Sequence, residues 1–96
     1  MNPYILAPAA QRDLRVLQAY MAQENIQAAR RVLADLRVAC ARLADNPSLG
    51  HAREDLTDQP VRFWSVRTYD IIYRPETRPL AIVRLVHSAR VIPHLL

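Results

Sequence analysis

Apolar residues in the first half of the chain recur at helical spacing, in two stripes. The first stripe, with steps of four, three and four residues, consists of Ala10, Leu14, Leu17 and Met21. It predicts a helix that begins at Pro8, whose missing N–H costs nothing there, and ends near Glu24. The second stripe consists of Ala29, Leu33, Leu36, Cys40 and Leu43. It predicts a second helix that Pro47 terminates, and because only residues 25–27 separate the two helices, they must form an antiparallel hairpin.

The pattern changes after Pro60, where β-branched and aromatic residues dominate. Residues 61–66, Tyr69–Arg74 and Leu80–His87 predict three strands in an antiparallel meander, and Tyr4–Leu6 predicts a brief strand before the helices. Arg67 and Thr68 are poor residues for a two-residue hairpin turn, which prefers Asn-Gly or Asp-Gly. They favour a connection wider than two residues.

The last predicted strand, Leu80–His87, is apolar on both alternating faces, which indicates a central or doubly covered position. Each face of a sheet is either buried or solvated, and the helical hairpin is the available cover for one face. We therefore expect one domain over residues 1–96. Its predicted fold is α+β, of order β-α-α-β-β-β, with the helical hairpin packed on a small, mostly antiparallel sheet.

Charge is distributed unevenly along the chain. Arginine accounts for all 13 lysine-or-arginine positions, which excludes any mechanism that needs a lysine ammonium. Residues 1–59 carry seven arginines and seven acids, whereas residues 60–96 carry six arginines against Asp70 and Glu76, so the whole excess of +4 falls in this last segment. His87 and His94 lie in the same segment. A localised excess of this kind predicts an anionic partner, either nucleic acid or an acidic protein surface.

Cysteine use and hydropathy bear on the compartment. Cys40 is the only cysteine, so no internal disulfide and no cysteine-based zinc site is expected. The N-terminus lacks the basic and apolar regions of a signal peptide, and no segment approaches the roughly 18 apolar residues of a membrane span. We expect a cytoplasmic protein that does not associate with membranes.

RNA cleavage is the enzymatic activity that these residues could support. It needs a base, an acid and cations around the phosphorane. His87 is the best titrating candidate, with Glu54 or Tyr69 as a second proton-transfer group. The arginines that could supply charge are Arg62, Arg67, Arg84 and Arg90. The alternative role of His87 is a hydrogen bond at a strand end.

Other chemistries find little support. Cys40 lies in the apolar stripe, where a thiol is inert packing, and His51, His87 and His94 are too scattered for a metal site. Arg84 stands out because it interrupts an apolar strand. Either Arg84 pairs with an acid such as Asp70 on the neighbouring strand, or its face of the sheet is an open binding surface.

Ordered motifs along nearly the whole chain resemble ParE-type toxins of the ParE/RelE superfamily. At the start they are residues 4–10 with Asp13, Leu14 and Tyr20. In the middle they are residues 43–47, Leu49, Gly50 and residues 53–56. At the end they are Arg62, Phe63, Tyr69–Arg74 and residues 84–90. The resemblance implies the same β-α-α-β-β-β fold and a type II toxin–antitoxin system, in which a ParD-type antitoxin wraps around the toxin.

The two branches of this superfamily differ in their targets. ParE-type members inhibit DNA gyrase and stabilise cleaved DNA, whereas RelE-type relatives cut mRNA on the ribosome. RelE-type sites commonly use lysines and a late tyrosine, but this chain has no lysine and no tyrosine after Tyr73. Some ribonuclease relatives instead use a histidine near the chain end, which His87 resembles.

The resemblance favours a toxin that inhibits gyrase by protein contact, with no catalytic residue, cofactor or metal. Its expected partners are a ParD-type antitoxin and gyrase, alone or with the DNA that gyrase has cleaved, and oligomers are expected only with the antitoxin. The candidate target contacts are Arg62, Arg67, Arg84, His87 and Arg90. The alternative is a RelE-like mRNA endoribonuclease that uses His87 with Arg62, Arg67 and Arg90. A third reading is a binding module without toxicity.

Overall fold

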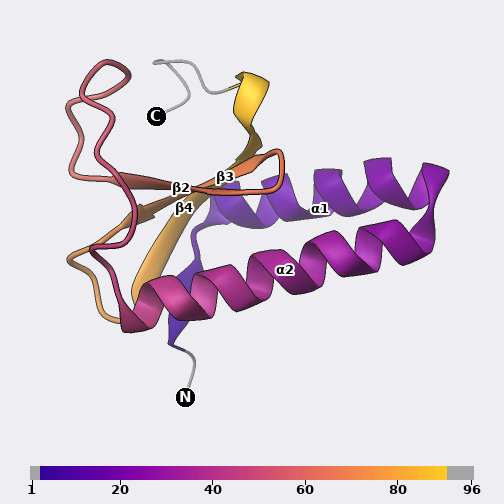
Figure 1. Cartoon of the computed structure of the whole chain (residues 1–96), viewed down its shortest axis with the longest axis horizontal. Helices are drawn as coiled ribbons and strands as arrows, with labels where there is room; N and C mark the ends of the chain where they lie inside the picture. The colour runs from indigo at the N-terminus through magenta and orange to yellow at the C-terminus, as the bar shows by residue number, and fades with distance from the viewer. Residues whose placement is uncertain (1–2, 91–96) are drawn as a thin grey trace.

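The computed structural model describes residues 3–90 and shows a helical hairpin packed on a four-stranded sheet (Figure 1). The helices are α1 (Pro8–Glu24) and α2 (Ile26–Asp45). The strands are β1 (Tyr4–Leu6), β2 (Arg62–Val66), β3 (Tyr69–Arg74) and β4 (Leu80–His87), followed by the short 3-10 helix η1 (Ser88–Arg90). This order confirms the predicted β-α-α-β-β-β arrangement. No helix within residues 3–90 is long and apolar enough to cross a membrane.

The strands lie in the order β1-β4-β3-β2. β2 pairs antiparallel with β3, and β3 pairs antiparallel with β4, whereas β1 pairs parallel with β4 from Tyr4 opposite Leu80 to Leu6 opposite Ile82. The sheet is therefore mostly antiparallel, as predicted, and β4 has a neighbour on both sides. That position explains why β4 is apolar on both faces.

A single residue connects the two helices, not the three predicted. Asn25 has extended backbone angles, and its side-chain Oδ1 accepts hydrogen bonds from the backbone N–H groups of Gln27 (2.9 Å) and Ala28 (3.1 Å). The N–H of Asn25 donates to the carbonyl of Met21 (3.0 Å), so the same residue closes α1. An asparagine N-cap of this kind satisfies N–H groups that a helix leaves free, so α2 starts immediately at Ile26.

The main core lies between the hairpin and one face of the sheet. Its most buried members are Leu36, Leu43, Ile71, Tyr73, Leu80 and Ile82. Cys40, at 3% exposure, belongs to this core, and burial raises the pKa of its thiol to about 12. The predicted reading of Cys40 as inert packing is therefore confirmed.

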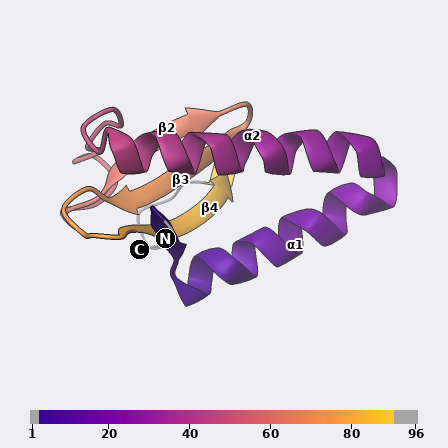
Figure 2. The ribbon, with the colours of Figure 1, turned by 90° about the horizontal axis from the view of Figure 1, so that it is seen from below.

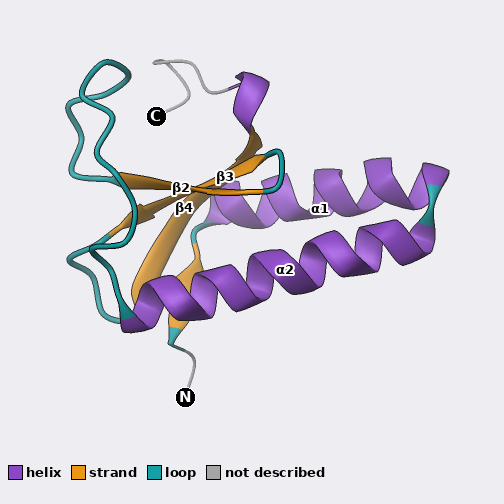
Figure 3. Ribbon diagram, in the orientation of Figure 1, coloured by secondary structure: helices purple, strands orange, loops and turns teal. Residues whose placement is uncertain are grey.

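The loop between α2 and β2 covers the opposite face of the sheet (Figure 3). Val61, Phe63, Ile72 and Val86 form a second buried cluster, and Leu56 of the loop packs against it. His51 and Phe63 exchange backbone hydrogen bonds of 2.9 and 2.8 Å, which tie the loop to β2. Both faces of the sheet are thus covered, one by helices and one by loop.

The connection from β2 to β3 contains only Arg67 and Thr68, so the expectation of a wider connection is wrong. Arg67 adopts a positive φ of 55°, the backbone region that glycine occupies most easily. The strand register from Arg62 opposite Tyr73 to Val66 opposite Tyr69 is continuous. Strand pairing therefore outweighs the unfavourable turn residue.

Candidate functional site

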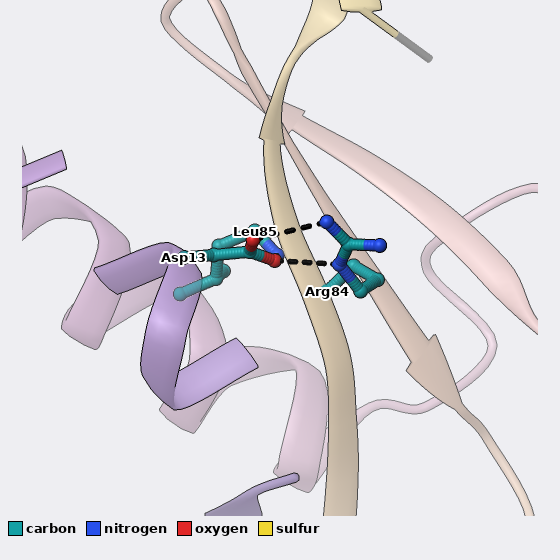
Figure 4. Close-up of polar contacts among 3 residues, drawn as sticks. All are labelled: Asp13, Arg84 and Leu85. Atoms are coloured by element: carbon teal, nitrogen blue, oxygen red, sulfur yellow. Dashed lines mark hydrogen bonds and ion pairs between the residues drawn. The ribbon is translucent and has the colours of Figure 1, made fainter. Parts of the chain in front are cut away.

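Arg84 is paired with Asp13 of α1 (Figure 4). β1 ends at Leu6, so the edge of β4 beyond Ile82 has no strand beside it, and α1 lies there instead. Nε of Arg84 lies 2.7 Å from Oδ2 of Asp13, and its Nη2 lies 3.0 Å from Oδ1. The N–H of Leu85 also donates to Oδ2, at 3.0 Å. One carboxylate therefore binds both the partly buried cation and the open strand edge.

Of the two environments predicted for Arg84, pairing with an acid is confirmed, although the acid is Asp13 of α1 and not Asp70, which was named as an example. The open binding surface is the alternative that the structure does not support. The side chains of Arg84 and Asp13 are only 21% and 16% exposed. The hydrogen bond that Arg84 donates to Asp13 raises the pKa of Arg84 above its ordinary value, against the opposing effect of burial. From the sequence, Asp13 was singled out only by the resemblance to ParE-type toxins. The available signal was an acid placed beside an apolar helical stripe, one position before Leu14.

Asp70 is buried in the sheet at 6% exposure and is satisfied by two hydroxyls. Its Oδ1 accepts hydrogen bonds from Oγ of Ser65 at 2.8 Å and Oγ of Ser88 at 3.0 Å. The two serines come from the neighbouring strand β2 and from η1. Asp70 therefore connects the start of η1 to the sheet.

Arg62 holds the covering loop. Its Nη1 donates to the carbonyl of Gly50 at 2.6 Å and to the carbonyl of Ser48 at 3.4 Å. The hydroxyl of buried Tyr73 donates to the carbonyl of Pro47 (2.6 Å) and accepts from the N–H of Gly50 (2.9 Å). Arg62 is thus committed to the loop that follows α2, which leaves it poorly placed to contact a target.

Arg67 and His87 lie at the same end of the sheet and are both exposed. Nε of Arg67 lies 2.7 Å from Oδ2 of Asp35 on α2, with both side chains about half exposed, at 49% and 48%. Nδ1 of His87 accepts a hydrogen bond from the N–H of Ala89 at 3.1 Å, which assigns the ring proton to Nε2. The His87 ring meets the Tyr69 ring edge-on at a centroid distance of 5.6 Å.

The residues of the predicted ribonuclease set do not all converge. Arg62 lies at the opposite end of β2 from Arg67, roughly 16 Å away at the strand rise of about 3.3 Å per residue. The hydroxyl of Tyr69 donates to Sδ of Met21, and Glu54 lies in the covering loop. The side chain of Arg90 and all of His94 lie outside the described residues. Within residues 3–90, no three His, Cys, Asp or Glu side chains group as a metal site.

The two helices diverge toward β1 (Figure 2). A groove of about 640 Å³ opens beside β1. Its lining residues are Pro3, Tyr4, Ile5, Leu6, Gln11, Arg37 and Ala41. Burial raises the pKa of Tyr4, and the nearby Arg37 guanidinium partly opposes that rise. The side-chain amide of Gln11 donates to the carbonyl of Leu6 at 2.9 Å. Arg37 is therefore the charged residue of this groove.

Because helix acids pair with sheet arginines, the arginines of the hairpin have few carboxylates left to pair with. Asp13 and Asp35 of the hairpin are committed to Arg84 and Arg67 of the sheet. Six hairpin arginines form no ion pair or hydrogen bond through their guanidinium groups within the described chain: Arg12, Arg15, Arg30, Arg31, Arg37 and Arg42. All six are exposed. These exposed arginines of the hairpin therefore add to the cationic charge that the sequence assigns to the strand-forming half.

The sequence matches a model of a known protein family. The family model described as ParE toxin of type II toxin-antitoxin system, parDE, matches residues 4–92. The matched region contains every helix and strand of the described fold, from β1 to η1. No curated protein sequence matches the chain. The chain belongs to the ParE toxin family of type II toxin–antitoxin systems.

Proposed function

We propose that this toxin inhibits DNA gyrase by protein contact and that a ParD-type antitoxin neutralises it. The observation that carries the proposal is the match of the ParE toxin family over residues 4–92, which includes the whole described fold. In this proposal the chain acts as one domain in the cytoplasm, without cofactor or metal, and forms oligomers only with its antitoxin. The target is gyrase, alone or with the DNA that it has cleaved.

The positions of the candidate contact residues decide which of them we propose for the surface that binds gyrase. Arg62 and Arg84 hold the loop and α1, so they act within the fold. Arg67 and His87 remain exposed at one end of the sheet, and Arg90 follows them in η1. We assign Arg67, His87 and Arg90 to the gyrase contact, where arginine can hold carboxylate or phosphate groups through two parallel hydrogen bonds.

The dispersal of proton-transfer groups supports contact over catalysis. General acid–base cleavage of RNA needs two groups within hydrogen-bond reach of one phosphate. His87 offers Nε2, but the hydroxyl of Tyr69 is turned to Met21 and Arg62 lies at the far end of β2. A contact inhibitor requires no such convergence.

Purified toxin added to gyrase and relaxed plasmid tests the proposal. Inhibition of supercoiling, with or without accumulation of linear DNA, is the expected result. Arg67→Gln should weaken the inhibition while leaving the circular dichroism spectrum unchanged, because exposed ion pairs contribute only about 0–1 kcal/mol to stability. Uninhibited gyrase at saturating toxin would refute the proposal.

A RelE-like mRNA endoribonuclease is the second candidate, and one observation favours it. His87 is exposed next to the turn that carries Arg67, so an imidazole and a guanidinium share one end of the sheet. Under this alternative, primer extension on cellular mRNA after induction would show discrete cuts. Those cuts would disappear in His87→Ala.

A further inference from the structure

The helical hairpin carries most of the arginines that have no carboxylate partner within the described residues. It contains six arginines without an ion pair, and only Glu24 and Asp45 remain as unpaired carboxylates. The described strands and loops keep three arginines outside ion pairs (Arg62, Arg74 and Arg78) against four carboxylates (Glu54, Asp58, Asp70 and Glu76). Within the described chain, the hairpin is therefore where exposed arginines outnumber unpaired carboxylates most strongly.

Two parallel rows of residues bring part of this charge to the junction between the helices. On α1 the row steps by four, three and four residues through Gln11, Arg15, Gln18 and Ala22. On α2 the row with the same steps contains Arg30, Ala34, Arg37 and Ala41. Gln11 of the first row and Arg37 and Ala41 of the second line one groove, so the two rows meet at this end of the hairpin. Residues with this spacing lie on one side of a helix.

These rows contain no carboxylate. The acids of α1 and α2 that lie near the sheet, Asp13 and Asp35, are held by Arg84 and Arg67. Glu24 lies at the tip of the hairpin and Asp45 at the end of α2. Arg15, Arg30 and Arg37, which we call the seam arginines, are exposed and have no internal acid to neutralise them.

The chemistry of the seam fits a phosphate backbone. Arg30 and Arg37 are separated by seven residues, about 10 Å along the helix. That separation equals about three base-pair steps along the axis of duplex DNA, at about 3.4 Å each. Between the arginines lie glutamine and alanine, which provide hydrogen-bond donors and close approach. The large apolar side chains exposed near the rows, Ile26 and Ile5, lie at their two ends.

We propose that the seam arginines form a binding surface for the phosphate backbone of duplex DNA, without sequence recognition. Guanidinium groups bind phosphate oxygens through two parallel hydrogen bonds, and each contact releases counterions from the DNA. The surface is separate from the gyrase contact proposed at Arg67 and His87. Its existence does not depend on which target the toxin inhibits.

A fluorescein-labelled 24-base-pair duplex, titrated with the full chain at several NaCl concentrations, tests this inference by fluorescence anisotropy. Arg30→Gln/Arg37→Gln should lower the slope of log K against log[salt] by about 1.8, since each phosphate contact contributes about 0.9. The matched control is Arg31→Gln/Arg42→Gln, which removes the same charge from the other flank of α2. All four positions are exposed and have no ion pair within residues 3–90, so both variants should fold normally.

Two results would overturn the proposal. If both double variants lower the slope equally, net charge and not the seam governs DNA binding. If the seam variant binds the duplex like the wild type but loses binding to labelled poly-glutamate, the surface serves an acidic polypeptide instead. Thermal unfolding of each variant confirms that any lost binding is not lost structure, and the gyrase assay reports separately on the proposed function.

Discussion

Replacing Asp13 with alanine removes the acceptor that joins α1 to the open edge of β4. Two groups lose this carboxylate as an acceptor: the Arg84 side chain, 21% exposed, and the backbone N–H of Leu85, a residue that is 5% exposed. Removing one member of a fully buried ion pair costs about 3–5 kcal/mol, and hydrogen bonds to charged groups contribute about 1.5–3 kcal/mol. Because about a fifth of the Arg84 side chain still reaches water, we expect a loss of about 2–4 kcal/mol.

Urea denaturation followed by circular dichroism measures this loss. In a domain of this size, 1 kcal/mol shifts the melting temperature by roughly 4–8 °C, so Asp13→Ala should lower it by roughly 8–32 °C in a thermal unfolding experiment. A double-mutant cycle with Arg84→Met isolates the pair, and we expect a coupling energy of about 1–3 kcal/mol. The cycle separates the ion pair from the additional contact of Asp13 with Leu85.

The Asp35–Arg67 pair provides the matched control. Its Nε–Oδ2 distance is the same 2.7 Å, but its side chains are 48% and 49% exposed. Exposed pairs contribute about 0–1 kcal/mol, so Asp35→Ala should change stability by less than 1 kcal/mol. If Asp13→Ala and Asp35→Ala cost the same, or if the Asp13–Arg84 coupling is zero, burial does not set the strength of the contact and the reasoning is wrong.

Four further predictions concern packing and the backbone. Leu36→Ala should destabilise the protein by about 2–5 kcal/mol in urea denaturation, because Leu36 is 2% exposed in the core. Gly50→Ala should cost about 1–3 kcal/mol by the same measurement, since a Cβ there would lie 2.6 Å from the Tyr73 hydroxyl. Arg67→Gly should be more stable than Arg67→Ala by about 1 kcal/mol, because both lose the ion pair but glycine tolerates the φ of 55°. Cys40, with its raised pKa of about 12 and 3% exposure, should react with a thiol reagent at pH 8 only after denaturation.

The element order could be predicted because each element has a local signature. The stripes at helical spacing place α1 and α2, and the β-branched runs place β3 and β4 at their observed bounds. The turn at Arg67 could not be predicted, since the pairing of β2 with β3 forces a two-residue connection that the local residues disfavour. Local preference ranks below sheet pairing in such a conflict.

The electrostatic surface was much less predictable. The partners Asp13 and Arg84 are separated by 71 residues, and they meet only because β1 ends early and α1 takes its place beside β4. Counting charges along the chain assigns the excess to the last segment. In the folded chain, however, two carboxylates of the helices, Asp13 and Asp35, form ion pairs with arginines of that segment. The partners of Arg62 could not be predicted for the same reason. The carbonyl groups of Ser48 and Gly50, which accept its hydrogen bonds, belong to a loop whose path depends on Tyr73.

The central functional claim, inhibition of gyrase by contact and without chemical modification, predicts a reversible effect. Gyrase is incubated with toxin until supercoiling stops and is then diluted far below the inhibitory toxin concentration, and the supercoiling rate is followed. A full return of the rate to that of untreated gyrase is the predicted result. Inhibition that persists after dilution, with the toxin no longer bound, would show covalent damage to gyrase and contradict the account.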